Sequence, residues 1–225
     1  SSMWKFDDLY RLFEKDQRFK PVIVVCPWLR YDKRTMIGQL EEVEQFCVNK
    51  GYNYVCTYNK DQDSWIDIKK ELSPDVIFFA QPYIDNNVKK EYSIINFLDK
   101  SLSCYAPYGF NVDCKQPKQF NLLFHNLMWK GFYETPIHKI MAEKYADNKG
   151  VNVEVSGYPQ FDEFRKVKES GDIKDHWKIK DKGVKRIIWA PHHTIEDNLH
   201  NVTQFSCFLY YHSFMLDLAK KYRGK

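Results

Sequence analysis

Two adjacent histidines follow a short apolar run near the end of the chain. The run 187–190 is closed by a proline, and His192 and His193 come next. In open α/β sheets, ligands bind just beyond the carboxyl ends of the strands. The residues from Thr194 fit a capping box, and the amino end of a helix binds anions such as phosphate. We therefore expect His192, His193 and Thr194 to contact a phosphate-bearing ligand, with at most one of the two imidazoles facing it.

A third candidate, His125, lies in the segment 121–130, which is too irregular for a simple helix or strand. An imidazole with a pKa of about 6.5 can take a proton from an attacking hydroxyl at neutral pH. The alternative is an interior histidine held by hydrogen bonds. The remaining histidines are predicted to be surface or helix residues without a role: His138, His176, His200 and His212.

Prolines and aromatic residues follow four of the predicted strands. Proline ends a strand and turns the chain outward, and an aromatic ring beside it can line a groove. The residues at these strand ends are Trp28, Tyr83, Tyr108, Gly109 and Tyr158. The sequence therefore predicts an aromatic-walled cleft along one edge of a sheet. The alternative is that these prolines only terminate strands.

The elements that must position these residues follow a regular alternation. Short apolar segments, typical of buried strands, are separated by segments with helical periodicity. The predicted strands are 21–26, 54–58, 75–80, 103–106 and 151–155, and the predicted helices are 4–13, 36–47, 65–72, 92–102 and 135–145. This alternation indicates an α/β fold with a Rossmann-like, doubly wound parallel sheet.

Domain organisation follows from a charged, glycine-containing stretch late in the chain. Residues 1–164 are predicted to form the first domain and residues 165–185 a linker. Residues 186–225 then supply one strand, 186–191, and one helix, 205–222. About 40 residues rarely bury enough surface to fold alone. We therefore expect 186–225 to be the start of an incomplete second domain.

Composition and missing motifs exclude several classes of protein. The net charge of +4 is modest, and no basic face is interleaved with aromatic residues, so nucleic acid is not an expected partner. No GxGxxG, Walker or GxSxG motif occurs. The six cysteines are scattered without CxxC spacing, which favours buried thiols in a reducing cytosol over bridges or a metal site. No apolar run approaches the roughly 18 residues of a membrane span.

Two of these segments together resemble a known family. The combination of Ser156–Asp162 (SGYPQFD) with Ile187–Ile195 (IIWAPHHTI) is similar to the CDP-glycerol glycerophosphotransferases. These are teichoic-acid polymerases and related bacterial capsule or exopolysaccharide transferases. The segments Tyr105–Gly109 and Phe124–Lys130 resemble motifs of the family's first domain. The resemblance covers nearly the whole chain.

The resemblance implies a GT-B architecture, in which two Rossmann-like lobes hold the acceptor and the nucleotide-activated donor, without a metal or other cofactor. His125 would be the base on the acceptor hydroxyl, and Trp129 would join the acceptor cleft. His192, His193 and Thr194 would contact the phosphates of CDP-glycerol or a similar donor. The acceptor would be a lipid-linked glycan at the cytoplasmic face of the membrane, where the protein is peripherally attached. Most of the donor-binding lobe would follow Lys225, so this chain alone is expected to be inactive.

Two other functions remain open at this stage. A GT-B glycosyltransferase that uses a nucleotide sugar would share these features, since the residues that grip the nucleotide are expected beyond this sequence. A non-catalytic α/β binding module, which supplies only an acceptor surface, is the alternative outside the enzymes.

Overall fold

The computed structural model describes residues 4–84, 88–112, 116–172, 177, 183–192 and 206–223. The chain divides into two compact units, Ser1–Asp172 and Ile173–Lys225. The boundary falls inside the range expected for the linker, although residues 165–170 of that range are helical. The unit up to Asp172 is called the first unit below, and the remainder the second unit.

The first unit is built on a four-stranded parallel sheet. Its strands are β5 (Val76–Phe79), β6 (Leu102–Tyr105), β7 (Lys130–Tyr133) and β8 (Val153–Val155), in the order β5-β6-β7-β8. A parallel pair, β1 (Ile23–Val25) with β2 (Tyr54–Cys56), and a hairpin, β3 (Tyr58–Asn59) with β4 (Ser64–Trp65), lie beside it. The α/β class with a parallel sheet is thus confirmed.

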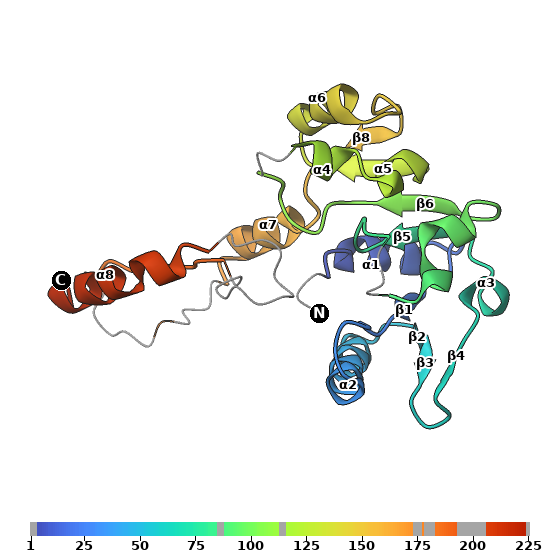
Figure 1. Ribbon diagram of the computed structural model, residues 1–225, viewed down its shortest axis with the longest axis horizontal. Helices are drawn as coiled ribbons and strands as arrows, with labels where there is room; N and C mark the ends of the chain where they lie inside the picture. The colour runs from blue at the N-terminus through green and yellow to red at the C-terminus, as the bar shows by residue number, and fades with distance from the viewer. Residues whose placement is uncertain are drawn as a thin grey trace. The chain divides into compact units, whose positions relative to one another are not determined.

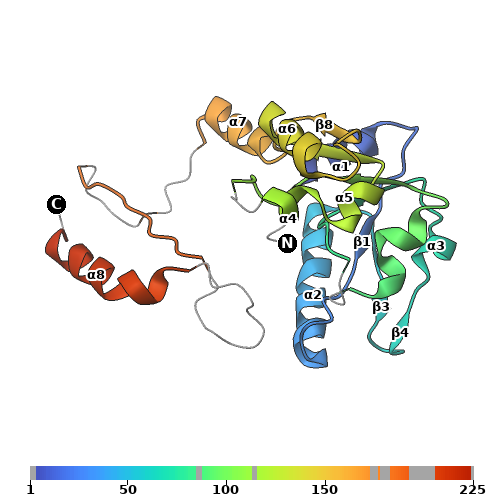
Figure 2. The ribbon, with the colours of Figure 1, turned by 45° about the horizontal axis from the view of Figure 1, so that its top comes forward.

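Helices flank the sheet on both faces (Figure 1). Their bounds are α1 Asp7–Lys15, α2 Lys33–Lys50, α3 Ile68–Glu71, the 3-10 helices Lys90–Tyr92 and Ile94–Phe97, α4 Gln116–Phe120, α5 Leu123–Leu127, α6 Pro136–Tyr145 and α7 Phe161–Ser170. Helix α2 runs beside β1 and β2 (Figure 2). It begins at Asp32, whose carboxylate accepts hydrogen bonds from the amides of Arg34 and Thr35, and ends at Gly51 in the left-handed conformation.

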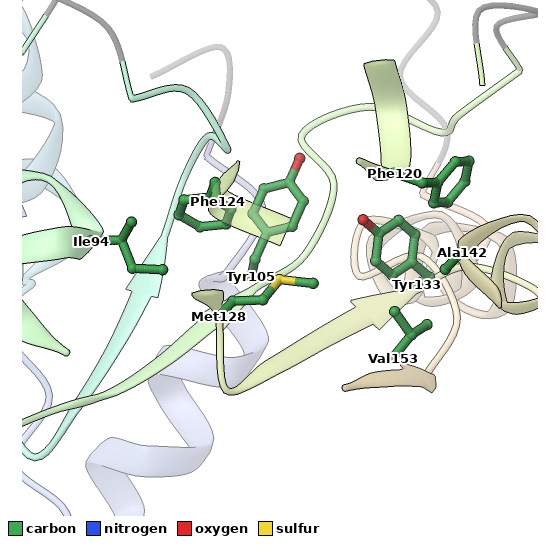
Figure 3. Close-up of a cluster of buried hydrophobic side chains, with 8 residues drawn as sticks. All are labelled: Ile94, Tyr105, Phe120, Phe124, Met128, Tyr133, Ala142 and Val153. Carbon is green, nitrogen blue, oxygen red and sulfur yellow. The ribbon is translucent and has the colours of Figure 1, made fainter. Parts of the chain in front are cut away.

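One face of the sheet is covered by the helices that follow its strands. Tyr105 of β6 and Tyr133 of β7 project into this face, where Phe124 packs against Tyr105 and Phe120 stacks on Tyr133 (Figure 3). The buried cluster comprises Ile94, Tyr105, Phe120, Phe124, Met128, Tyr133, Ala142 and Val153. Large aromatic side chains dominate this core, and each removes a large apolar area from water.

The opposite face is covered from the beginning of the chain. The rings of Phe78 in β5 and Phe132 in β7 stack with centroids 6.2 Å apart. Phe6 and Phe13 of the α1 region pack on Phe78 at 5.8 and 6.0 Å. Alternate side chains of a strand point to opposite faces, so the sheet is buried on both sides.

Several predicted elements are wrong. The segment 121–130, left without an element, forms α5, and the next residues form β7, which was not predicted. The predicted helix 92–102 is replaced by two short 3-10 helices, and the helix 65–72 shortens to α3 because Trp65 pairs in the hairpin with Tyr58.

The second unit contains one described helix, α8 (Phe208–Lys221). The predicted strand 186–191 does not form: within residues 183–192 no strand is assigned, and Ile187 and Ile188 are 77% and 76% exposed. A strand is stable only when neighbouring strands satisfy its backbone and cover its apolar side chains. No strand is assigned among the described residues of the second unit, and this apolar run is exposed.

Candidate functional site

A cavity in the first unit lies at the carboxyl edge of the parallel sheet. Its volume is about 250 Å³. Its lining residues are Tyr105, Pro107, Tyr108, Gly109, Phe110, Asn111, Val112, Gln119 and Tyr133. Tyr105 and Tyr133 end β6 and β7, and most of the others belong to the loop 107–112, which we name the acceptor loop for the ligand proposed below. This is the edge at which parallel α/β sheets bind ligands.

Two tyrosines meet beside this cavity. The hydroxyls of Tyr83, which follows β5, and Tyr108, which follows β6, are 2.9 Å apart and hydrogen bonded. Their ring centroids are 6.3 Å apart, and the residues are 42% and 40% exposed. The pair therefore presents phenol groups and ring faces to solvent, both of which can contact a small ligand.

The deep wall of the cavity is formed by buried phenols. Burial raises the pKa of Tyr105 and of Tyr133 well above the usual value. Both hydroxyls are thus neutral across the physiological range and can donate or accept a hydrogen bond. The cavity wall is polar without being charged.

A cluster of ionisable residues lies buried next to this wall. Glu134 directly follows β7, its side chain is 1% exposed, and its Oε1 accepts a hydrogen bond of 3.2 Å from the amide of Asn111. His138 Nδ1 is 3.3 Å from Glu134 Oε2, and His138 Nε2 is 2.9 Å from the carbonyl oxygen of Asn111. Glu134 and His138 together therefore hold both backbone polar groups of one acceptor-loop residue.

The third member of the cluster is Lys5. Its Nζ donates to the carbonyl oxygen of Ala80 at 3.3 Å, just after β5, and lies 5.5 Å from the ring centroid of Tyr105. Burial lowers the pKa of Lys5 from 10.5 to about 7, and the negative charge of Glu134 opposes this shift. An amine that titrates near neutral pH at a sheet edge is typical of functional sites.

The structure places His125 in the interior. Its residue exposure is 3%, its Nδ1 accepts a hydrogen bond of 3.1 Å from the amide of Leu122, and its ring packs 5.9 Å from that of Tyr105. Burial lowers the pKa of His125 from 6.5 to about 4. Asn152 donates to the carbonyl oxygen of His125 at 2.9 Å. His125 is therefore a neutral interior histidine behind Tyr105, as in the alternative interpretation, and it is not among the residues that line the cavity.

The tyrosines predicted for the cleft lie at the carboxyl edge of the sheet. Tyr108 and Gly109 line the cavity, and Tyr83 bonds to Tyr108. Tyr158, which follows β8, packs against Phe110 of the acceptor loop at 5.8 Å.

The two tryptophans predicted for the cleft lie elsewhere. Trp28 follows β1 and is half-buried, outside the cavity lining. Trp129 immediately precedes β7, at the amino edge of the sheet, and is 48% exposed. Trp129 is therefore not among the residues that line the cavity, because β7 separates it from the carboxyl edge.

The expected donor-side residues belong to the second unit. His192 is exposed, and His193 and Thr194 lie outside the described residues. No metal-binding group of three His, Cys, Asp or Glu side chains occurs in the described part of the chain. None of the helices assigned there is long and apolar enough to cross a membrane.

Sequence reasoning missed Lys5, Glu134 and His138. His138 was expected to be a surface or helix residue; it lies on α6 but is buried. The signal for the pair was available, since Glu134 and His138 are four residues apart beside the N1 proline of α6. This spacing did not predict a site because β7 was not predicted, and Glu134 was therefore not placed at the end of a strand. Nothing in the sequence marked Lys5.

The fold and the cavity define an α/β protein with a candidate small-molecule site at the carboxyl edge of its parallel sheet. Comparison of the chain with known proteins found no matching family model, no matching curated protein and no matching solved structure.

Proposed function

We propose that the cavity binds the hydroxyl-bearing acceptor of a group-transfer reaction. The observation that carries this proposal is the cavity itself, about 250 Å³ in volume and walled by three tyrosines, a phenylalanine and two amide side chains. Ring faces pack against the apolar face of a sugar or polyol, while phenols and amides bind its hydroxyls. The described residues that line the cavity carry phenols, amides and apolar side chains, and these groups suit a neutral, hydroxyl-bearing ligand.

The reaction that fits this site and the sequence motifs is transfer of a polyol phosphate. In this proposal the chain belongs to a GT-B transferase that moves glycerol phosphate from CDP-glycerol, or a similar donor, to a lipid-linked glycan at the cytoplasmic face of the membrane. His192, His193 and Thr194 would contact the phosphates of the donor. The support for this reaction is the resemblance of Ser156–Asp162 and Ile187–Ile195 to glycerophosphotransferase motifs.

The burial of His125 changes its proposed role. A general base must reach the proton that it abstracts, and its pKa should lie near the working pH. His125 lies behind Tyr105 and has a pKa of about 4, so its position and its basicity both argue against this role. We assign His125 to support of the cavity wall.

Nucleotide release distinguishes the candidate reactions. The full-length protein is incubated with a glycan acceptor and CDP-glycerol, CDP-ribitol or a UDP-sugar. Release of CMP from a CDP-polyol supports the glycerophosphotransferase, whereas release of UDP supports the nucleotide-sugar glycosyltransferase. Acceptor binding with no nucleotide released in any case supports the non-catalytic module.

Substitution of Tyr108 by alanine is expected to weaken binding of methyl β-glucoside or ribitol about tenfold, or about 1.4 kcal/mol. The change removes one exposed ring face of the site and the hydrogen bond to Tyr83. Isothermal titration of the purified chain measures the affinity. Trp129→Ala is the matched control, because it removes a similarly exposed ring at the opposite edge of the sheet and should leave the affinity unchanged. Equal losses in the two variants, or a wild type that binds neither probe, would contradict the proposed site.

A further inference from the structure

The acceptor loop is held in place by two buried side chains that belong to other elements. Glu134 Oε1 accepts from the amide of Asn111 at 3.2 Å, and His138 Nε2 lies 2.9 Å from the Asn111 carbonyl oxygen. A carbonyl oxygen only accepts, so Nε2 must carry the proton in this bond. Nδ1 of the same ring lies 3.0 Å from the hydroxyl of Thr135, which orients the imidazole.

The two anchoring side chains are rigidly placed. Glu134 extends directly from β7, a central strand of the sheet, and His138 lies in the first turn of α6. The residue exposures of both are below one tenth. The ring of Phe110 packs against the His138 imidazole at 5.7 Å, so one loop side chain joins the backbone contacts.

The other contacts of the loop include a hydrogen bond between Tyr108 and Tyr83 and ring contacts of Phe110 with Tyr158 and Phe161. No helix or strand is assigned to residues 106–112, and Tyr108, Gly109, Phe110 and Val112 are exposed. Yet the acceptor loop supplies six of the nine described residues that line the cavity. The shape of the cavity therefore depends on the position of this loop.

From this arrangement we infer that Glu134 and His138 are positioning residues, which clamp the acceptor loop and thereby set the affinity of the cavity for its ligand. The inference rests on the proposed function in assigning the ligand, a neutral sugar or polyol. Neither side chain reaches the cavity, so the pair acts through Asn111 and not by touching the ligand. A pre-formed loop binds more tightly because less conformational entropy is lost on binding.

Paired substitutions at each position, of which one keeps and the other removes the hydrogen bond to Asn111, test the clamp. His138→Gln keeps a donor near the position of Nε2, whereas the shorter side chain of His138→Asn cannot reach the Asn111 carbonyl. Glu134→Gln keeps the oxygen that accepts from the Asn111 amide, whereas Glu134→Met removes it. Amide hydrogen exchange across residues 107–112 reports the clamp without a ligand, titration with methyl β-glucoside and ribitol reports the affinity, and urea denaturation reports the fold.

We expect Glu134→Met and His138→Asn to speed exchange of the Asn111 amide about tenfold and to weaken probe binding by a similar factor. The two glutamine variants should stay within about threefold of wild type in both measurements. Wild-type exchange and affinity in folded Glu134→Met and His138→Asn proteins would overturn the inference, as would equal damage from both members of each pair. If the wild type binds neither probe, the proposed function fails, and the exchange measurement alone decides whether the clamp exists.

Discussion

Acidification from pH 6.5 to pH 4 is expected to lower the free energy of unfolding of the first unit by about 3 kcal/mol through His125 alone. The pKa of His125 is about 4 in the folded chain and 6.5 when exposed. Between these values the unfolded state binds a proton that the folded state does not, so stability falls as the pH falls. Each unit of pKa difference corresponds to about 1.4 kcal/mol. The contribution is fully present above pH 6.5 and lost at pH 4.

His125→Asn isolates this contribution. The asparagine oxygen can replace Nδ1 as the acceptor for the amide of Leu122, and an amide side chain does not titrate. Urea denaturation at several pH values between 4 and 7 gives the free energy of unfolding of each protein. The variant should lose most of the pH dependence over this range, whereas His192→Asn, which changes an exposed histidine, should keep it. A His125→Asn protein with the slope of wild type would show that His125 is accessible to protons in the folded state.

A rise in pH from 7 to 8.5 is expected to stabilise the first unit by about 2 kcal/mol through Lys5. Its pKa is about 7 in the folded chain and 10.5 when exposed, so the unfolded state holds the additional proton over this interval. Burial disfavours the charged form of the Lys5 amine. The free energy of unfolding therefore rises with pH between pH 7 and pH 10.5 and levels off above pH 10.5. Buried thiols act in the opposite direction above pH 9, because burial raises the pKa of Cys26 and of Cys104.

The difference between wild type and Lys5→Met removes these other groups from the comparison. Methionine retains the length and apolar packing of the lysine stem without a titrating amine. Denaturation of both proteins at pH 7 and pH 8.5 should show the rise in wild type only, with Lys5→Met the more stable protein at pH 7. Lys15→Met, at an exposed position on α1, should behave like wild type. Equal slopes in wild type and Lys5→Met would place the Lys5 ammonium in solvent.

The alternation of apolar and amphipathic segments was sufficient to predict the parallel α/β class. Helical periodicity located two helices: the predicted segments 36–47 and 135–145 correspond to α2 and α6. The strand β7 escaped prediction because its sequence, KGFY, is short and contains a glycine. It forms because β6 and β8 pair with it on both sides, which is information from distant parts of the chain.

The same limit applied to the candidate site. Of the aromatic residues expected in a cleft, Tyr108 lines the cavity and Tyr83 is hydrogen bonded to it. The cluster of Lys5, Glu134 and His138 could not be found in this way, because Lys5 lies far from the other two residues in the sequence. Burial also decides the chemistry of a histidine: His125 and His138 look alike in the sequence, yet one packs behind a tyrosine and the other anchors a loop.

The covering of one sheet face by Phe6 and Phe13 has a consequence for biosynthesis. These aromatic residues leave the ribosome before any strand of the sheet that they later cover, so their contacts with Phe78 can form only after β5 has been made. Contacts of such large sequence separation form slowly, and exposed apolar surface invites aggregation in the interval. A truncation at the amino end that removes Phe6 and Phe13 would therefore expose the sheet face that carries Phe78, and it would also remove the Lys5 amine.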